Sequence, residues 1–481
     1  MSHRVHALIN GEWIWEGISR ERRNPARWDE VVATYPELSP VHLAAAVEAA
    51  QAAQPAWARL GARVRGDILR QVGSLVRQRA DDLAALITLE QGKTHREAAA
   101  EADKAARVLD HVAAAGVRSG GHTFPQGQGG RIDLTLRCPL GVVALITPWN
   151  FPVAIPIGKL APALAAGNTA VLKPASVTPC CAEAVAQLFV DAGIPPGVIN
   201  VVTGRGSDVG AALATHPHIK AVSFTGSTAT GEALHKAVAG RGVKVQCEMG
   251  GQNPLVVLDD ADLPAAIAAV VRGAFAGAGQ RCTATSRVIV TPGIADALVD
   301  GILDAMQAIR PGDGRHPSTT MGPLIDPGSL ERVLGHISGA VAAGARVRAG
   351  GCRLTSGSLA AGLFLAPTLL DDVLPSMRVA QEELFGPVLS VLRVDNFAEA
   401  IAVANGTSYG LSAAVYTRNL THALAFVEEV ASGIVHVNAT NQSGEVYMPF
   451  GGIKASGIGP RELGDASLDF YSEIKAVYLH S

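Results

Sequence analysis

The chain has 481 residues, 48% of them hydrophobic, and its 40 basic and 43 acidic side chains leave a formal net charge of −3. A domain holds roughly 100 to 200 residues, so this length predicts two or three domains rather than one simple core. The sequence contains no basic run or basic arm, which argues against nucleic acid or an anionic membrane as a partner. Together these features favour an enzyme that acts on a small molecule.

The cysteines show no metal-ligand or disulfide pattern. They lie along the chain with neither a CxxC pair nor a Cys/His ligand spacing, at Cys138, Cys180, Cys181, Cys247, Cys282 and Cys352. We therefore expect reduced thiols and no bound metal. The N-terminus lacks the apolar core of a signal peptide, and Gly, Pro or charge interrupts every apolar run before it reaches membrane-spanning length. The sequence thus predicts a cytoplasmic protein without a membrane segment.

The first 115 residues are predicted to be mainly helical after a short opening piece that contains Asn10-Gly11. Ser39 is expected to cap a helix with Pro40 in its first turn. Apolar residues at helical spacing support this helix and a second one: Leu43, Val47 and Ala50, then Ile68, Val72, Leu75 and Val76. A third helix is expected after Gly92, in the Ala/Glu/Lys-rich segment that ends at Ala115.

Two segments are expected to form exposed strands. Residues 131–137 alternate in polarity and place Ile132, Leu134 and Leu136 on one face. An edge strand of this kind is usually covered, and a neighbouring subunit is one plausible cover. The tail from Phe470 to Leu479 is expected to form a second exposed strand that pairs outside its own domain.

From Gly141 onward, short apolar runs alternate with helical stretches. Five runs predict strands, at 142–146, 169–172, 198–202, 221–224 and 243–247. Thr178-Pro179 is expected to open one of the intervening helices. Continuous apolar strands between helices are typical of a parallel sheet buried on both faces, so we expect a doubly wound α/β domain. A second α/β pattern begins near Gly251, with predicted strands at 255–258, 287–290, 388–394, 413–416 and 434–437.

Cys282 is the candidate nucleophile. It follows the glycine-rich stretch 275–281, and glycines let the backbone approach a ligand closely. The alternative is that Cys282 is only a small buried hydrophobe. Glu248, in Glu-Met-Gly-Gly, and Asn150, in Pro-Trp-Asn-Phe-Pro, supply a candidate base and a candidate amide donor, which favours the catalytic interpretation.

The nucleotide-binding signals differ in strength. Residues 204–210, which include Gly206 and Gly210, read GxGxxxG rather than the dinucleotide fingerprint GxGxxG, so this motif is weak alone. Residues 224–231 follow a predicted strand and open a helix, where free amides can face a pyrophosphate; a turn needed only for packing is the alternative. Lys173 ends a predicted strand, at the edge where open α/β sheets bind ligands, although it could be an ordinary solvated lysine.

Seven motifs in this order resemble those of the NAD(P)-dependent aldehyde dehydrogenase superfamily, across nearly the whole chain. They are Pro-Trp-Asn-Phe-Pro at 148–152, Lys-Pro-Ala-Ser at 173–176, Phe-Thr-Gly-Ser-Thr at 224–228, Glu-Met-Gly-Gly at 248–251, Gly-Gln-Arg-Cys at 279–282, Glu-Leu-Phe-Gly-Pro at 383–387 and Pro-Phe-Gly-Gly at 449–452.

The resemblance implies an aldehyde dehydrogenase-like α/β fold. It has a doubly wound parallel-sheet cofactor domain, a second α/β catalytic domain and a small β oligomerisation arm. We expect residues 1–117 and 140–250 to form the dinucleotide-binding domain and residues 251–448 the catalytic domain. Residues 118–139 and 449–481 are expected to form the arm and the C-terminal tail. The resemblance also implies a homodimer or a homotetramer.

The resemblance assigns the chemistry as follows. Cys282 attacks an aldehyde, the side-chain amide of Asn150 and the backbone amide of Cys282 bind the oxyanion, and Glu248 activates water to hydrolyse the resulting thioester. NAD or NADP accepts the hydride. Lys173 and Glu383 contact the riboses, and Lys173 also belongs to the expected catalytic residues. The other expected cofactor contacts are Thr147, Trp149, Ser176, Gly206, Gly210, Phe224, Gly226, Ser227, Met249 and Phe385.

Ser176 departs from the pattern of NAD-preferring relatives, which often carry a glutamate at this place. A glutamate would bind the ribose hydroxyls and repel a 2′-phosphate by like charge. A serine beside Lys173 removes this repulsion. We therefore predict that NADP is accepted, and that it can be the preferred cofactor.

Gly158 bears on the substrate. Succinate-semialdehyde dehydrogenases usually carry an arginine at this place, where it holds the substrate carboxylate. The segments 154–156, 279–287 and 470–478 instead resemble 2,5-dioxopentanoate (α-ketoglutarate semialdehyde) dehydrogenases, so we expect that substrate. Succinate semialdehyde and a general aliphatic or aromatic aldehyde are the alternatives. Arg281 is a candidate cation for an acidic substrate or for the thiol, with a structural salt bridge as the alternative.

Two rival interpretations belong to other classes. A cysteine hydrolase, such as a thioesterase or amidase, would pair Cys282 with a histidine, but no histidine motif suggests a partner. It would also leave the helix-opening Gly-Ser-Thr unexplained. A catalytically silent relative is opposed by the presence of all three residues of the expected catalytic set.

Overall fold

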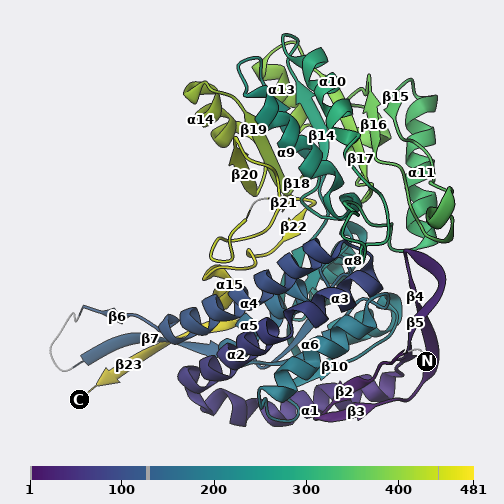
Figure 1. The fold of residues 1–481 in the computed structure, drawn as a ribbon. Helices are drawn as coiled ribbons and strands as arrows, with labels where there is room; N and C mark the ends of the chain where they lie inside the picture. Colours follow the sequence, from purple (N-terminus) through teal and green to yellow (C-terminus); the bar gives the residue numbers. More distant parts are fainter. Residues whose placement is uncertain (1–2, 126–130, 443, 481) are drawn as a thin grey trace.

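Two large sheets organise the protein. The computed structural model describes residues 3–125, 131–442 and 444–480, and over these residues the chain forms an eight-stranded sheet, a seven-stranded sheet and three smaller ones. Figure 1 shows the eight-stranded sheet and its helices in the lower half, the seven-stranded sheet in the upper half, and an extension of strands that leaves the body. The α/β fold class expected from the sequence is confirmed.

The eight-stranded sheet has the order β22-β12-β11-β8-β9-β10-β2-β3. Its five central strands are parallel: β8 (Val142–Ile146), β9 (Thr169–Lys173), β10 (Ile199–Val201), β11 (Ile219–Thr225) and β12 (Lys244–Glu248). All five were predicted from their apolar runs. Antiparallel strands complete the edges: β2 (Ala7–Ile9), β3 (Glu12–Ile14) and β22 (Gly457–Ile458). Since β22 comes from the predicted tail 449–481, part of that segment joins this sheet rather than the arm.

Helices cover both faces of this sheet, as a doubly wound topology requires. Along β8, Val143 and Leu145 enter one hydrophobic core, whereas Val142 and Ala144 enter the other. The first core contains α2 (Gly61–Gln78), α3 (Ala80–Gln91), α4 (His95–Arg118), α5 (Ala154–Ala165) and α6 (Pro179–Asp191). The second contains residues of α1 (Pro40–Arg59), α7 (Ala211–Thr215) and α8 (Thr228–Val238).

The seven-stranded sheet has the order β15-β16-β17-β14-β13-β19-β20. Its strands are β13 (Asn253–Val257), β14 (Thr285–Val290), β15 (Arg346–Ala349), β16 (Thr368–Asp371), β17 (Val388–Arg393), β19 (Ser412–Tyr416) and β20 (Ile434–Val437). The sequence predicted five of them and missed β15 and β16. One face packs on α9 (Leu263–Phe275) and α10 (Ala295–Met306). The other packs on α11 (Pro327–Ala342), α13 (Phe397–Asn405) and α14 (Leu420–Glu429).

Several short elements lie between the longer helices and strands. They are η1 (Gly206–Gly210), η2 (Ala276–Gly279), η3 (Gly357–Ala361), α12 (Arg378–Gln381), β18 (Tyr409–Gly410), β21 (Ile453–Lys454) and α15 (Ala466–Phe470). Strand β18 pairs with β21, and so links the segment after α13 to the C-terminal region. No helix in the described part of the chain is both long and apolar enough to cross a membrane.

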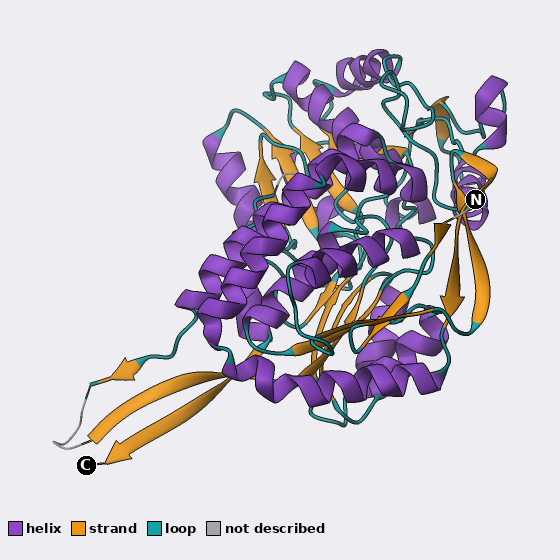
Figure 2. Ribbon diagram, turned by 60° about the horizontal axis from the view of Figure 1, so that its bottom comes forward, coloured by secondary structure: helices purple, strands orange, loops and turns teal. Residues whose placement is uncertain are grey.

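The expected exposed strands form one antiparallel sheet. Strand β7 (Arg131–Pro139) pairs along its length with β23 (Ser472–His480), and β6 (Thr123–Phe124) pairs on its other side. Figure 2 shows the two long strands leaving the body side by side. The tail strand begins at Ser472 rather than Phe470, because Phe470 ends α15. Residues 126–130 of the predicted arm lie outside the described residues.

The N-terminal segment differs from the expectation. It contains strands β1 to β5, of which β1 (His3–Arg4), β4 (Ile18–Asn24) and β5 (Arg27–Glu37) form a separate three-stranded sheet. Charged residues interrupt β1 and β4, and the apolar runs of β2 and β5 are short, so these strands are weakly marked in the sequence. Ser39 precedes α1 as predicted, but its Oγ bonds to His42 Nδ1 at 2.8 Å and caps no backbone amide.

A buried carboxylate joins α3 to α6. Glu90 Oε1 accepts from the amide of Cys180 at 2.7 Å and Oε2 from that of Cys181 at 2.9 Å. These amides lie in the first turn of α6, where helical N–H groups have no partner within the helix. Glu90, in the last turn of α3, therefore caps the start of α6.

We expect Glu90→Ala to destabilise the protein by about 1–3 kcal/mol, because it leaves buried amides without an acceptor. Thermal unfolding followed by circular dichroism measures the change as a lower midpoint. Glu48→Ala, at an exposed position of α1, is the control. Equal midpoints for the two variants would contradict the capping role.

Candidate active site

Sequence-predicted residues gather at one edge of the eight-stranded sheet. Parallel strands end at the same edge, where open α/β sheets bind ligands. Four neighbouring strands contribute: Thr147, Trp149 and Asn150 follow β8, Lys173 ends β9, Phe224, Gly226 and Ser227 lie at the end of β11, and Glu248 and Met249 lie at the end of β12. The order of the strands thus brings together residues that are up to 102 positions apart in the sequence.

The other sheet contributes residues that precede its strands. Cys282 lies just before β14, and Glu383 and Phe385 lie just before β17. The side-chain amide of Asn253, the first residue of β13, donates to the carbonyl of Cys282 at 2.8 Å. The site therefore forms where the carboxyl ends of one set of strands meet the amino ends of another.

Asn150 reaches the loop that carries the thiol. Its Nδ2 donates to the carbonyl of Gln280 at 3.2 Å, two residues before Cys282. Its buried Oδ1 has no hydrogen-bond partner among the described residues. An amide with one N–H group engaged has a second N–H group, which can serve an oxyanion.

Cys282 lies in an environment that opposes the thiolate. Burial raises the pKa of its thiol to about 12, and the negative charges of Glu383 and Glu248 act in the same direction. The Lys104 ammonium and a backbone hydrogen bond from Thr283 lower it. These interactions place both carboxylates near the thiol, and they identify Lys104 as a neighbour that the sequence did not single out.

Glu248 is buried, and burial together with the nearby Glu462 raises its pKa well above the usual range. Lys159 and Arg461 act in the opposite direction. The backbone amide of Gly452 donates to Glu248 Oε2 at 3.3 Å, and Lys159 pairs with Glu462. The candidate base is thus part of a buried charged cluster made by three regions of the chain.

The carboxylate of Glu383 lies against the two glycines that follow Met249. Burial raises the pKa of Glu383 to about 7. The amide of Gly251 donates to its Oε1 at 3.1 Å, and a Cβ at Gly250 would lie 2.0 Å from its Oε2. A cavity beside Glu383 is also lined by Phe385, Gly251, Gly279 and Arg281. Any side chain at position 250 would displace this carboxylate.

The aromatic rings expected at the cofactor contact one another. Trp149 and Phe385 lie with ring centroids 5.4 Å apart at an interplanar angle of 86°, an edge-to-face arrangement. Phe385 has a φ of +56°, which is uncommon for a bulky residue. Strain at a site of this kind is typical of functional loops.

Lys173 and Ser176 lie at the end of β9. The Nζ of Lys173 donates to the carbonyl of Pro174 at 2.9 Å, and burial lowers the pKa of this lysine to about 8. Ser176 Oγ donates to the carbonyl of Gly204 at 2.8 Å. A Cβ at Gly210 would lie 4.0 Å from the Lys173 side chain, so the glycine-rich segment 204–210 ends beside Lys173. A Cβ at Gly206, by contrast, would meet open space.

The Gly-Ser-Thr turn opens α8 as predicted. Ser227 is the N-cap, and its Oγ accepts from the amide of Thr230 at 3.4 Å. A Cβ at Gly226 would lie 2.5 Å from the Phe224 ring, and one at Gly231 would lie 2.5 Å from Met249 Sδ. Packing therefore requires both glycines, whatever ligand the helix terminus binds.

A dinucleotide fits the residues at this edge. Lys173 is buried with a backbone carbonyl as its hydrogen-bond partner, Glu383 is partly buried, and the buried Oγ1 of Thr147 has no partner among the described residues. Ribose hydroxyls can accept a hydrogen bond from an ammonium and donate one to a carboxylate. Such bonds would offset the cost of removing the Lys173 and Glu383 charges from water.

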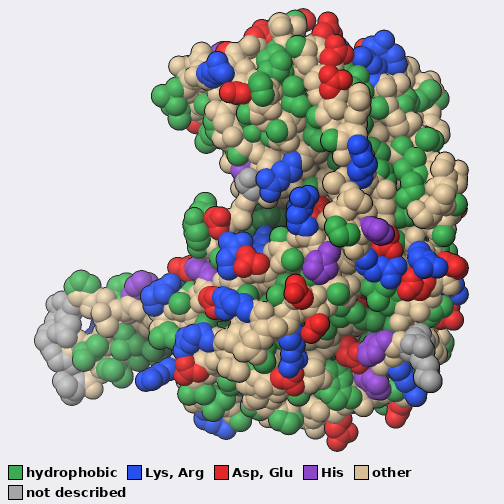
Figure 3. Space-filling view, in the orientation of Figure 1, with side chains coloured by type: hydrophobic (Ala, Val, Ile, Leu, Met, Phe, Trp, Pro, Cys, Tyr) green, Lys and Arg blue, Asp and Glu red, His purple; other side chains and the backbone are tan. Residues whose placement is uncertain are grey.

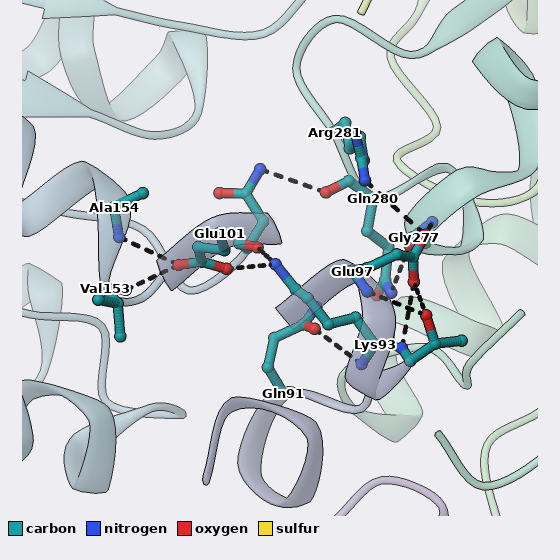
Figure 4. A network of polar contacts seen from close by, with 11 residues as sticks. Gln91, Lys93, Glu97, Glu101, Val153, Ala154, Gly277, Gln280 and Arg281 are labelled. Carbon is teal, nitrogen blue, oxygen red and sulfur yellow. Dashed lines mark hydrogen bonds and ion pairs between the residues drawn. The ribbon is translucent and has the colours of Figure 1, made fainter. Parts of the chain in front are cut away.

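The polar face of α4 ties the two catalytic loops together (Figure 4). Glu101 accepts from Lys93 Nζ at 2.6 Å and from the amides of Val153 and Ala154 at 2.9 and 3.1 Å. Lys93 also donates to the carbonyl of Asn150 at 2.7 Å. We call Lys93, Glu97 and Glu101 with their partners the α4 network.

Glu97 extends the α4 network to the thiol loop. Its Oε1 accepts from the amide of Gly277 at 2.7 Å and lies 3.7 Å from the Arg281 guanidinium. Asn150 and Arg281 were predicted from the sequence, whereas Lys93, Glu97 and Glu101 were not. The charged positions on one face of an otherwise alanine-rich helix are the signal that could have found them.

The sequence profile of the aldehyde dehydrogenase family matches residues 15–477. The chain belongs to this family. It is 41% identical to the alpha-ketoglutaric semialdehyde dehydrogenase of Bacillus subtilis (strain 168), over 98% of this chain and 97% of that protein. It is 42% identical to the succinate-semialdehyde dehydrogenase [NADP(+)] of Escherichia coli (strain K12), over the same shares.

A solved structure agrees with these similarities. The crystal structure of an E. coli NADP dependent enzyme aligns with a TM-score of 0.96 and 41% identity, over 100% of this chain and 98% of the other. The protein is therefore an NAD(P)-dependent aldehyde dehydrogenase, and the cysteine-hydrolase alternative is not favoured. The roles of individual residues stay predictions.

Arg281 is engaged within the dehydrogenase. Besides its pairing with Glu97, it donates to Gln442 Oε1 at 3.1 Å and lies 5.4 Å from the centroid of the Phe151 ring. These contacts match the structural alternative, while its substrate role stays a prediction. Arg287 binds the backbone carbonyls of Gln252, Val403 and Ala404 and does not reach the site.

We expect Glu462→Gln to move the acid limb of the dehydrogenase pH–rate profile to lower pH. Glu462 raises the pKa of Glu248, so removing its charge lowers that pKa and ionises the base at lower pH. The measurement is kcat across pH at saturating aldehyde and cofactor. Glu473→Gln, on β23, is the control; an unchanged or upward-shifted limb in Glu462→Gln would contradict the charged cluster.

Proposed function

We propose that the dehydrogenase oxidises a carboxylated semialdehyde, with 2,5-dioxopentanoate as the preferred substrate. The whole-length similarity to a dehydrogenase of alpha-ketoglutaric semialdehyde carries this proposal. Position 158 of α5, where the succinate-semialdehyde enzymes usually carry an arginine, is a glycine in this chain. The adjacent Lys159 does not replace that arginine, because it pairs with Glu462 and donates to Ser223 Oγ at 2.7 Å.

The proposed reaction begins with attack of the Cys282 thiolate on the aldehyde carbon. The side-chain amide of Asn150 and the backbone amide of Cys282 stabilise the oxyanion, and loss of one such donor typically costs about 100- to 1,000-fold in kcat. Bound NAD or NADP supplies the hydride acceptor that allows the adduct to become a thioester. Glu248 then takes a proton from water, which attacks the thioester and frees Cys282, a role worth roughly 100- to 10,000-fold.

The remaining predicted residues bind the cofactor in this proposal. Lys173 and Glu383 hold the riboses, and Ser227 with Gly226 holds the pyrophosphate at the start of α8. Trp149 and Phe385 flank the ends of the cofactor. The charge at Glu383 also matters for the thiol, because this carboxylate raises the pKa of Cys282.

We also infer a cytoplasmic homodimer or homotetramer. All six cysteines are free, and reduced thiols persist in that compartment. Large apolar side chains on the extended sheet are about half exposed: Phe124, Ile132, Leu136, Ile474, Tyr478 and Leu479. Exposed apolar strands are usually covered, and another copy of the chain is a suitable cover. Sedimentation equilibrium that returned the mass of one chain would contradict the assembly.

The substrate proposal predicts a hierarchy of kcat/KM in an aldehyde panel. We expect 2,5-dioxopentanoate to exceed succinate semialdehyde, and both to exceed butanal, pentanal and benzaldehyde. Reduced-nicotinamide absorbance, measured with NAD and with NADP, gives the constants. Equal or higher kcat/KM for the neutral aldehydes would overturn the proposal of a carboxylated substrate.

The cofactor proposal predicts the effect of a charge at position 176. We expect Ser176→Glu to lower the ratio of kcat/KM for NADP to that for NAD by about 10- to 100-fold, through like-charge repulsion of the 2′-phosphate. Ser176→Gln has the same size without the charge and serves as control. Equal changes of this ratio in both variants would show that the size of the side chain, rather than its charge, causes the effect. A wild-type enzyme that used NAD alone would contradict the cofactor proposal.

A further inference from the structure

Helix α4 carries a cation toward the catalytic thiol. Lys104 lies three residues after Glu101 and seven after Glu97, so helical spacing places all three on one face. Glu97 and Glu101 hold the loops that carry Cys282 and Asn150. The next turn of the same face, which carries Lys104, therefore lies against the site. This position agrees with the lowering of the Cys282 pKa by the Lys104 charge.

Three neighbouring cations are paired with carboxylates. Lys93 pairs with Glu101 at 2.6 Å, and Arg281 lies 3.7 Å from Glu97. Arg107, one turn beyond Lys104, pairs with the Asp103 and Glu445 carboxylates at 3.0 and 3.2 Å. Each of these three charges has a counter-ion within the chain.

Lys104 differs from these three cations. Within the described residues, no carboxylate lies at ion-pair distance from its ammonium, although the residue is partly buried. Burial lowers its pKa, because a charge removed from water without a partner is destabilised. A bound anion would supply the missing partner.

The charges around the thiol limit where such an anion can bind. The negative charges of Glu248 and Glu383 raise the pKa of the Cys282 thiol, and both would repel a carboxylate. Lys104 provides the opposite charge from α4. Figure 3 shows a hollow between the two halves of the molecule with basic side chains gathered around it. A ligand that reacts at Cys282 and carries an acidic end would therefore orient that end toward Lys104.

We propose that Lys104 binds the distal carboxylate of the semialdehyde whose aldehyde carbon reacts at Cys282. This inference rests on the proposed function and names a residue for its specificity. Succinate-semialdehyde enzymes usually bind the substrate carboxylate with an arginine of α5, and Gly158 occupies that position in this chain. The proposal assigns carboxylate binding to α4 instead. The ligand class is a short aliphatic aldehyde with a carboxylate at its other end.

Lys104→Met tests the proposal with paired substrates. The ratio of kcat/KM for 2,5-dioxopentanoate to that for pentanal is expected to fall about 10- to 100-fold, the usual range for loss of a charge-assisted hydrogen bond. The loss should lie mainly in KM for the acidic substrate. Lys104→Arg should restore part of the ratio, and Arg107→Met, one turn along the helix, should leave it unchanged.

The outcomes separate this inference from the function on which it rests. A wild-type enzyme that does not prefer the acidic aldehyde contradicts the proposed function itself. A wild-type preference that survives in Lys104→Met overturns the inference alone. Equal losses for both aldehydes also overturn it, since they would assign Lys104 to the thiol rather than to the substrate. Thermal unfolding of each variant verifies that the fold is retained.

Discussion

The buried ion pair between Lys93 and Glu101 is the interaction on which the active site depends. Lys93 holds the backbone of Asn150, and Glu101 holds the two amides that open α5. Breaking a buried pair by removing one partner typically costs about 3–5 kcal/mol, since the other charge stays buried and alone. The position of Asn150, the proposed oxyanion donor, therefore depends on α4.

The same helix spans the two sheets. Glu97 binds the loop before Cys282, so the α4 network connects a loop of the eight-stranded sheet to a loop of the seven-stranded one. Cys282 and Glu248 lie on opposite sides of this junction, and burial raises the pKa of both. A buried base with a raised pKa is better matched to proton transfer near neutral pH, whereas the thiol needs favourable interactions to ionise.

The central strands and the motif residues could be predicted because their signals are local. β8 and β9 are buried along their whole length and read as continuous apolar runs, and the residues that follow them lie at the ligand-binding edge. The N-terminal strands could not be predicted in this way. Strand β4, with the sequence Ile-Ser-Arg-Glu-Arg-Arg-Asn, is half exposed and lacks an apolar run.

The partners of the site residues were missed for a different reason. Glu462 lies 214 positions after Glu248, and Lys104 lies 178 positions before Cys282, so no spacing in the sequence relates them. Their effect depends on three-dimensional proximity and burial, which determine whether a charge is stabilised or opposed. Local patterns identified the groups that are proposed to react, whereas the fold reveals the charges that shift their pKa values.

The central claim is that Cys282 carries the acyl group until Glu248 delivers water. Intact-protein mass spectrometry of Glu248→Gln, quenched after mixing with 2,5-dioxopentanoate and NADP, tests it most directly. The account predicts an added mass equal to the acyl group, mapped by proteolysis to the peptide that contains Cys282, with reduced cofactor formed in a single stoichiometric burst. Undiminished steady turnover without an adduct, or an adduct on another cysteine, would contradict it.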